Sequence, residues 1–291
     1  MRPVIFKVLM LAIVQGAAEL LPVSSSAHVI VAEKLLGLDP TRPQMTLLLV
    51  MLHTGTMFAV ILYFWKSWKK SFFGSIKVFK ESAWAVIAAT FFTGVIGLAL
   101  MEIIEKVILH APHAQVEQIF GNMTIIGSGL GAAGLLIIFS EWRGRASALD
   151  ASNGNMPDTK GASMIGAMQG LCLPFRGFSR SGATISAGLL LGMKRLIAEE
   201  FSFALAVVLT PPVIGRELWR LMAAHHLTLE GLPGASSLLA PSLLGMVFSF
   251  ITGLLALRWL SSWLERGRWH YFGLYCLAAS AAVFILHAHG F

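Results

Sequence analysis

The sequence predicts an all-α membrane protein, a polytopic helical bundle with an inverted-topology repeat and two re-entrant helix hairpins. Its composition is the first reason: of 291 residues, 56% are hydrophobic and 13% are charged, with a mean hydropathy of +0.74. The core of a water-soluble protein cannot bury so large a share of apolar residues. The second reason is a series of long apolar stretches separated by basic connections, and the third is a residue pattern that occurs twice.

The apolar stretches are each about long enough to cross the hydrocarbon core of a bilayer as a helix. They are residues 45–65, 83–101, 121–139, 201–222, 241–259 and 271–286. We expect a single membrane domain over residues 1–291, with inverted repeats of about 1–140 and 141–291.

The net charge of +7 comes mainly from basic residues between the apolar stretches. Lys and Arg are frequent in 66–80, 143–160 and 258–268, but 105–120 has one Lys, and 223–240 and 287–291 have none. Because cytoplasmic loops are enriched in Lys and Arg, the basic connections are expected in the cytoplasm and the others outside. This topology explains the positive charge without a nucleic-acid partner. Cys172 and Cys276 have no spacing typical of a zinc site or a disulfide framework.

The repeated pattern reads Gln-Gly, then Leu-Pro, then a serine cluster, in 15–26 and again in 169–181. Each copy precedes a short apolar stretch, 29–36 or 185–193, and then Ala-Val-Ile-Leu at 59–62 or Ala-Val-Val-Leu at 206–209. The charge pattern requires 161–193 to enter and leave on the cytoplasmic side, and 6–36 to do so from outside. The tips near 22–26 and 174–181 are therefore expected to meet in mid-membrane, as broken helices of inverted repeats do.

The first copy carries candidate reactive groups. Gln15 and Glu19 are four residues apart, so they share one helix face. A carboxylate inside a membrane helix needs a compensating metal or cationic group, although a merely structural ion pair is the simpler alternative. Pro22 ends the helix, and the serines at 24–26 begin the next one, where hydroxyl groups cap free N–H groups and where phosphate binds.

The second copy repeats this device at Ser179, Arg180 and Ser181. Any single serine is more simply a helix cap, but the guanidinium of Arg180 can bind a phosphate through two hydrogen bonds. Gly177 would let the backbone approach a ligand closely.

Histidine offers a general acid or base. His28 lies three residues after Ser25, so we expect the two to share a face, with a satisfied core histidine as the alternative. The remaining histidines are expected to be structural or interfacial. They are His53, His110, His113, His225, His226, His270, His287 and His289.

These residues resemble the undecaprenyl-diphosphate phosphatases of bacteria, the bacitracin-resistance type of membrane phosphatase. The first family signature has an acidic residue or Gln, three residues, Glu, and a Leu-Pro-Val-Ser-Ser loop ending in His, which 15–28 match. The second, Pro-Gly-x-Ser-Arg-Ser-x-x-Thr, resembles 176–184. Gln15 stands where many members carry Glu, and Arg176 replaces the usual Pro.

The resemblance implies hydrolysis of undecaprenyl diphosphate to undecaprenyl phosphate and inorganic phosphate, which recycles the lipid carrier for cell-wall synthesis and gives bacitracin resistance. It places the enzyme in the bacterial inner membrane with the active site facing the periplasm. It implies a Mg²⁺ or Ca²⁺ ion held by Glu19 and Gln15, a polyprenyl diphosphate lipid and membrane lipids as partners, and is compatible with a homodimer. The implied catalytic residues are Glu19, Ser25, His28 and Arg180, and the implied substrate-binding residues are Gln15, Ser24, Ser26, Ser179, Ser181, Thr184 and Gly177.

Two questions stay open at the level of sequence. Ser25 is the candidate nucleophile, with His28 or Glu19 handling its proton, but direct attack by water is the alternative. Opposed re-entrant hairpins also occur in transporters, so a polyprenyl-phosphate flippase or a small-anion transporter is the competing function.

Overall fold

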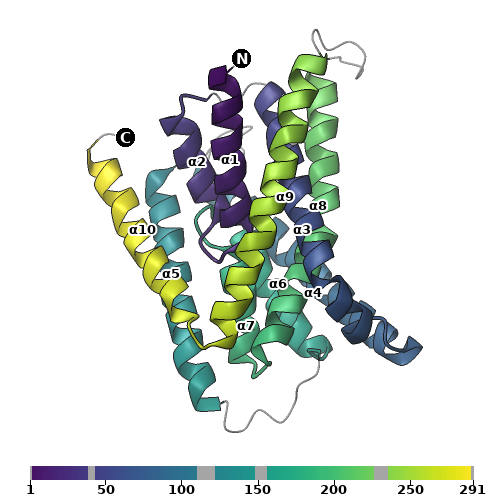
Figure 1. Ribbon diagram of the computed structural model, residues 1–291. Helices are drawn as coiled ribbons and strands as arrows, with labels where there is room; N and C mark the ends of the chain where they lie inside the picture. Colours follow the sequence, from purple (N-terminus) through teal and green to yellow (C-terminus); the bar gives the residue numbers. More distant parts are fainter. Residues whose placement is uncertain (1, 39–42, 110–121, 148–155, 226–234, 290–291) are drawn as a thin grey trace.

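The computed structural model describes residues 2–38, 43–109, 122–147, 156–225 and 235–289, and within these ranges the regular elements are helices (Figure 1). The predicted all-α class is therefore confirmed. Parts of the two connections expected outside, 110–120 and 226–234, are not among the described residues. The helices are α1 Arg2–Leu20, α2 Ser25–Leu35, α3 Pro43–Ser71, α4 Ile76–Ile103 with its π-helical continuation η1 Ile104–Leu109, α5 Met123–Ser147, α6 Thr159–Cys172, α7 Arg180–Leu190, α8 Arg195–His225, α9 Ala235–Glu265 and α10 His270–Ala288.

Within the described part of the chain, six helices are long and apolar enough to cross a membrane: α3, α4, α5, α8, α9 and α10. Apart from Asn122, which precedes α5, they contain the described parts of the six apolar stretches named from the sequence. Large apolar side chains stand exposed on their outer faces, such as Trp84 and Leu98 on α4 and Trp219 on α8. Apolar faces of this extent are stable in contact with lipid. The protein is a multi-pass membrane protein.

The shorter helices form two hairpins. α2 packs beside α1, and α7 beside α6. Pro22 and Pro174 lie in the two breaks, where a proline prevents the preceding helix from continuing. In Figure 1, α1 and α2 occupy the upper part of the molecule, and α6 and α7 lie toward the lower part. The two breaks thus approach each other inside the bundle.

Glycine positions the two hairpins. A Cβ atom at Gly16 of α1 would lie 2.7 Å from the carbonyl oxygen of Ser249 on α9, and one at Gly170 of α6 would lie 2.9 Å from that of Thr93 on α4. Glycine at these points lets two helix backbones come closer than any other residue allows. The repeated Gln-Gly pair thus has the same packing function in both copies.

α8 connects the hairpins to the rest of the bundle. Phe201 and Phe203 are buried in the largest apolar cluster. The Glu200 carboxylate accepts hydrogen bonds from Ser67 and Ser71 of α3, so this buried acid joins α3 to α8. α8 is thus anchored both in the apolar core and on the C-terminal end of α3.

Candidate active site at the two helix breaks

The Glu19 carboxylate lies at the centre of the site. Its Oε2 accepts hydrogen bonds from Ser25 Oγ at 2.6 Å and from Gln15 Nε2 at 3.1 Å. Its Oε1 accepts one from Arg180 Nη2 at 3.0 Å, with the side chain of Glu19 only 14% exposed. The predicted shared face of Gln15 and Glu19 and the predicted cationic partner are both confirmed, and the partner comes from the other copy of the repeat.

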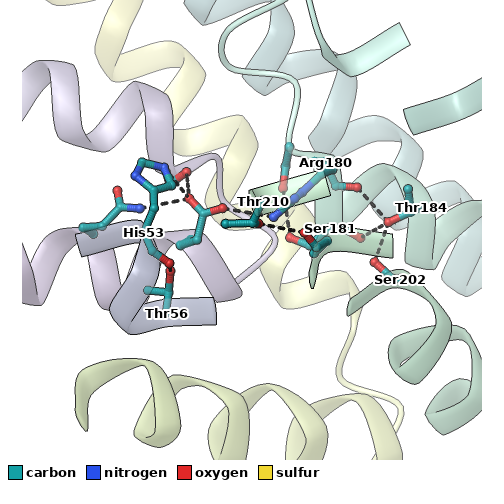
Figure 2. A network of polar contacts seen from close by, with 12 residues as sticks. His53, Thr56, Arg180, Ser181, Thr184, Ser202 and Thr210 are labelled. Atoms are coloured by element: carbon teal, nitrogen blue, oxygen red, sulfur yellow. Dashed lines mark hydrogen bonds and ion pairs between the residues drawn. The ribbon is translucent and has the colours of Figure 1, made fainter. Parts of the chain in front are cut away.

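A second contact joins the two breaks. Ser181 Oγ, at the start of α7, donates a hydrogen bond to the Leu21 carbonyl oxygen at 3.4 Å. Together with the Glu19 and Arg180 ion pair, it brings 19–25 and 180–181 into one site (Figure 2). The expectation that the two tips meet is confirmed.

A polar cavity of about 220 Å³ lies between the breaks. Since a water molecule occupies about 30 Å³ in the liquid, this space suits a phosphate-sized group. All five predicted serines line it, together with both arginines of the second copy. These lining residues are Ser24, Ser25, Ser26, Ser179, Ser181, Arg176 and Arg180. The cavity combines hydroxyl donors with two guanidinium groups, which is the chemistry that binds an anionic phosphate.

The two helix starts at the cavity differ. Ser179 caps α7, because its Oγ accepts a hydrogen bond from the Gly182 amide at 3.2 Å. The cap predicted for Ser24 was wrong: this side chain caps no described amide of α2 and lies 3.3 Å from Ser26 Oγ instead. The reason is the Ser24 backbone, at φ 68° and ψ 94°, a conformation that side chains other than glycine's rarely adopt. The start of α2 therefore lacks the cap that α7 has.

His28 lies three residues after Ser25 on α2, and its ring contacts α10. Its Nδ1 donates to the Ser24 carbonyl oxygen at 2.8 Å, while Nε2 lies 2.6 Å from the Tyr275 hydroxyl. Both ring nitrogens therefore have partners other than the Ser25 hydroxyl, which donates to Glu19, and proton transfer between His28 and Ser25 stays a prediction. The spacing along a helix determines the face on which a residue lies. The orientation of the His28 ring depends in addition on its packing against α10.

His53 is the residue that the sequence analysis missed. Its Nε2 lies 3.6 Å from Glu19 Oε2, and its Nδ1 donates to the Leu49 carbonyl oxygen at 2.8 Å. Its side chain is 42% exposed, on the side of the carboxylate away from Arg180 (Figure 2). The sequence offered one indication that His53 belongs to the site, namely its position on α3, six residues before the repeated 59–62 segment.

Two predicted ligand residues lie elsewhere. Thr184 Oγ1 donates to the Arg180 carbonyl oxygen at 2.9 Å and lies 2.5 Å from Ser202 Oγ, so it stabilises α7 against α8. Gly177 has φ 101°, and a Cβ there would overlap the Ile126 carbonyl oxygen of α5. Neither residue lines the polar cavity. Gly177 is required for a turn against α5, not for closeness to a ligand.

Glu19 and Gln15 can supply part of the ligands of a divalent ion. Within the described ranges, no group of three His, Cys, Asp or Glu side chains is close enough to hold a metal. Glu19 and Gln15 offer one carboxylate and one amide oxygen. Mg²⁺ is commonly held by one or two carboxylates plus phosphate oxygens of a substrate, so these residues fit an ion that arrives with the substrate.

The fold and the site define a multi-pass membrane protein with a charged, hydroxyl-lined cavity for an anionic group. The chain belongs to the family described as Bacitracin resistance protein BacA, whose model matches residues 8–282. It is 58% identical over 281 residues to Undecaprenyl-diphosphatase 2 of Acinetobacter baylyi, covering 96% of each chain. It is 33% identical to Undecaprenyl-diphosphatase of Thermus thermophilus, over 95% of each chain, and 32% identical to that of Korarchaeum cryptofilum, over 97% of this chain and 99% of the relative. The family resemblance drawn from the two signatures is confirmed.

Proposed function

We propose that this protein is an undecaprenyl-diphosphatase, which hydrolyses undecaprenyl diphosphate to undecaprenyl phosphate and inorganic phosphate. The observation that carries the proposal is the Glu19 carboxylate, which accepts from the Ser25 hydroxyl and pairs with Arg180 beside a hydroxyl-lined cavity. The names of relatives that align over nearly the whole chain support the same activity. In the cell this reaction recycles the lipid carrier for cell-wall synthesis and gives resistance to bacitracin.

Substrate binding follows from the cavity. The diphosphate enters between the two breaks, where Arg180 and Arg176 balance its charge and Ser179 and Ser181 donate hydrogen bonds. The N-terminal end of α7 adds the positive end of a helix dipole. Arg180 already lies against Glu19, so the phosphate and the carboxylate share one guanidinium group.

Ser25 is the proposed nucleophile. Its Oγ attacks the terminal phosphorus while its proton passes to Glu19 Oε2, already its hydrogen-bond partner at 2.6 Å. The bond between phosphorus and the bridging oxygen breaks, and undecaprenyl phosphate leaves. His53 takes this proton from Glu19. The freed carboxylate then deprotonates a water molecule, which displaces phosphate from Ser25 while Ser25 Oγ takes a proton back from His53. If water attacks directly, the same carboxylate takes the proton, so Glu19 is essential in either case.

We propose that a divalent cation, Mg²⁺ or Ca²⁺, is the cofactor. Glu19 and Gln15 would hold it, and it would supply neutralisation of the diphosphate charge. The other steps use the chain's own residues: Arg180 orients the diphosphate, and His53 accepts a proton from Glu19.

The architecture in the membrane is the second part of the proposal: α1 with α2 and α6 with α7 are re-entrant hairpins of an inverted repeat, approximately 1–140 and 141–291. Helix pairing supports this, since α1 packs on α9 and, at the matching place, α6 packs on α4. Gly16 and Gly170 occupy the same place in these two pairs. We assign the protein to the bacterial inner membrane, with the cavity open to the periplasm. We also propose that it forms a homodimer, which light scattering of the solubilised protein tests.

Phosphate release in detergent micelles tests the activity. The purified protein is expected to release inorganic phosphate from undecaprenyl diphosphate, and Arg180→Ala to lose most of this activity. Arg258→Ala, which removes an exposed arginine of α9, is the matched control. A flippase or an anion carrier would release no phosphate in micelles, which contain no compartments, so that result would reject the proposal.

A further inference from the structure

A basic surface lies where α3 ends and α4 begins. We call the exposed side chains of residues 65–80 the lysine surface. Its five lysines are all exposed, and they are Lys66, Lys69, Lys70, Lys77 and Lys80. Residues 65–80 contain no Asp or Glu, and the next acid along the chain is Glu81. None of the five lysines lines the polar cavity, so this positive charge is separate from the site at the two breaks.

Large apolar side chains share the lysine surface. Trp65, Phe73, Ile76 and Phe79 are between 44% and 72% exposed. Lys69 Nζ lies 5.9 Å from the centre of the Trp65 ring, and the Phe73 and Phe79 rings stack with their centres 5.7 Å apart. Aromatic rings beside cations are typical of the membrane–water interface, where the rings contact the acyl chains and the ammonium groups reach the headgroups.

The lengths of α3 and α4 place this surface beyond the apolar part of the membrane. The two helices contain 29 and 28 residues, whereas about 20 residues cross the hydrocarbon core. In Figure 1, the end of α3 and the start of α4 project from the lower right of the bundle. Because the lysines begin where the apolar stretch 45–65 ends, they lie at the level of the lipid headgroups.

The opposite face of the end of α3 packs against the bundle. Trp68 and Phe72 are buried in the largest apolar cluster. Ser67 and Ser71 donate hydrogen bonds to the buried carboxylate of Glu200 on α8. Among the described residues, no carboxylate forms an ion pair with the five lysines. Packing thus fixes one face of the helix end and leaves the lysine face turned outward.

We propose that the lysine surface binds the headgroups of anionic phospholipids in the leaflet that it faces. Each lysine near an anionic membrane surface favours binding by about fivefold. This connection is expected in the cytoplasm, where the membrane surface is negative. An acidic protein segment would match the charge, but an anionic lipid also supplies acyl chains for the exposed rings of Trp65 and Phe73.

Two double variants that remove the same charge test the proposal. Lys66→Gln with Lys70→Gln changes the lysine surface, and Lys160→Gln with Lys194→Gln, at exposed positions elsewhere, is the control. The solubilised protein is titrated with phosphatidylglycerol or with phosphatidylcholine of the same acyl chains, and native mass spectrometry counts the bound lipids. Unfolding midpoints without added lipid are expected to be equal in all three proteins, which checks their folding.

The wild type and the control are expected to bind phosphatidylglycerol about tenfold or more tightly than phosphatidylcholine. The lysine-surface variant is expected to lose about tenfold or more of its affinity for phosphatidylglycerol, with no change for phosphatidylcholine. Equal affinity of the wild type for the two lipids would overturn the proposal. Equal phosphatidylglycerol affinities of the two double variants would overturn it as well.

Photolabelling tests the position of the lipid. Phosphatidylglycerol with a diazirine in its headgroup is expected to label peptides within 65–80, and labelling confined to other peptides would overturn the proposal. If the lysine-surface variant turns a dimeric wild type into a monomer without changing its phosphatidylglycerol affinity, the surface binds a second copy of the chain instead. None of these measurements uses turnover, so their outcome is independent of the proposed activity.

Discussion

Ser25 Oγ lies 2.6 Å from Glu19 Oε2 and donates its hydrogen bond to that oxygen. The two residues belong to different helices, α2 and α1, and the break between these helices brings them together. Arg180 binds the other carboxylate oxygen, so Oε2 remains the acceptor for the Ser25 proton. In the proposed mechanism, this geometry makes Glu19 the base.

Replacing either member of this pair is expected to stop turnover while the protein still folds. Ser25→Ala removes the nucleophile and Glu19→Gln removes the base, each lowering kcat by about 10²–10⁴-fold. Phosphate release under single-turnover conditions measures this, with size-exclusion profiles as the check on folding. If Ser25→Ala retains wild-type turnover while Glu19→Gln does not, attack by water replaces the covalent route.

The two histidines are expected to differ in kinetics. His53 lies next to Glu19, so His53→Gln removes the group that accepts its proton and lowers kcat by about 10²-fold or more. His28 contacts Tyr275, so His28→Gln is expected to change mainly KM for the lipid. Tyr275→Phe removes the same hydrogen bond and serves as the matched variant. A loss of kcat in His28→Gln with none in His53→Gln would reverse this assignment.

Chelation is expected to abolish phosphate release, since the proposed divalent ion would neutralise part of the diphosphate charge. Activity after EDTA treatment should return with Mg²⁺ or Ca²⁺ and not with Na⁺ at the same ionic strength. In the same titration, Gln15→Glu is expected to reach half-maximal activity at a lower metal concentration, because a second carboxylate raises the affinity of the site for the ion. Full activity in excess EDTA contradicts the proposed cofactor.

The two hairpin glycines are expected to be sensitive to a single methyl group. Gly16→Ala and Gly170→Ala place a Cβ 2.7 and 2.9 Å from carbonyl oxygens, and overpacking of this kind costs about 1–3 kcal/mol. Gly94→Ala on α4 is the control, because nothing lies within 4 Å of its added Cβ. Thermal unfolding in micelles should show lower midpoints for the first two variants and no loss for the third.

Ser24 offers a test of backbone strain. Its φ of 68° favours glycine, so Ser24→Gly is expected to be more stable than Ser24→Ala by about 1 kcal/mol or more. Both variants lack the hydroxyl, so their difference isolates the backbone. Equal unfolding midpoints for the two variants would mean that the break holds no such strain.

The sequence alone determined the helical class, the six long apolar helices and the residues of the two breaks. Periodicity, loop charge and repeated motifs are local along the chain, and each depends on neighbours close in sequence. The polar cavity was predictable because its serines and arginines sit in repeated segments. The pairing of Glu19 with a cation was predictable because a buried carboxylate requires one.

Tertiary structure alone decided which partner each side chain met. His28 turns to Tyr275, while His53 reaches Glu19 from a helix that carries no motif at that point. Thr184 and Gly177 match the signature yet serve packing against α8 and α5. An apolar cavity between α1, α9 and α10 has no counterpart in any single segment. Contacts between distant segments depend on how whole helices pack, and spacing within one helix does not encode that.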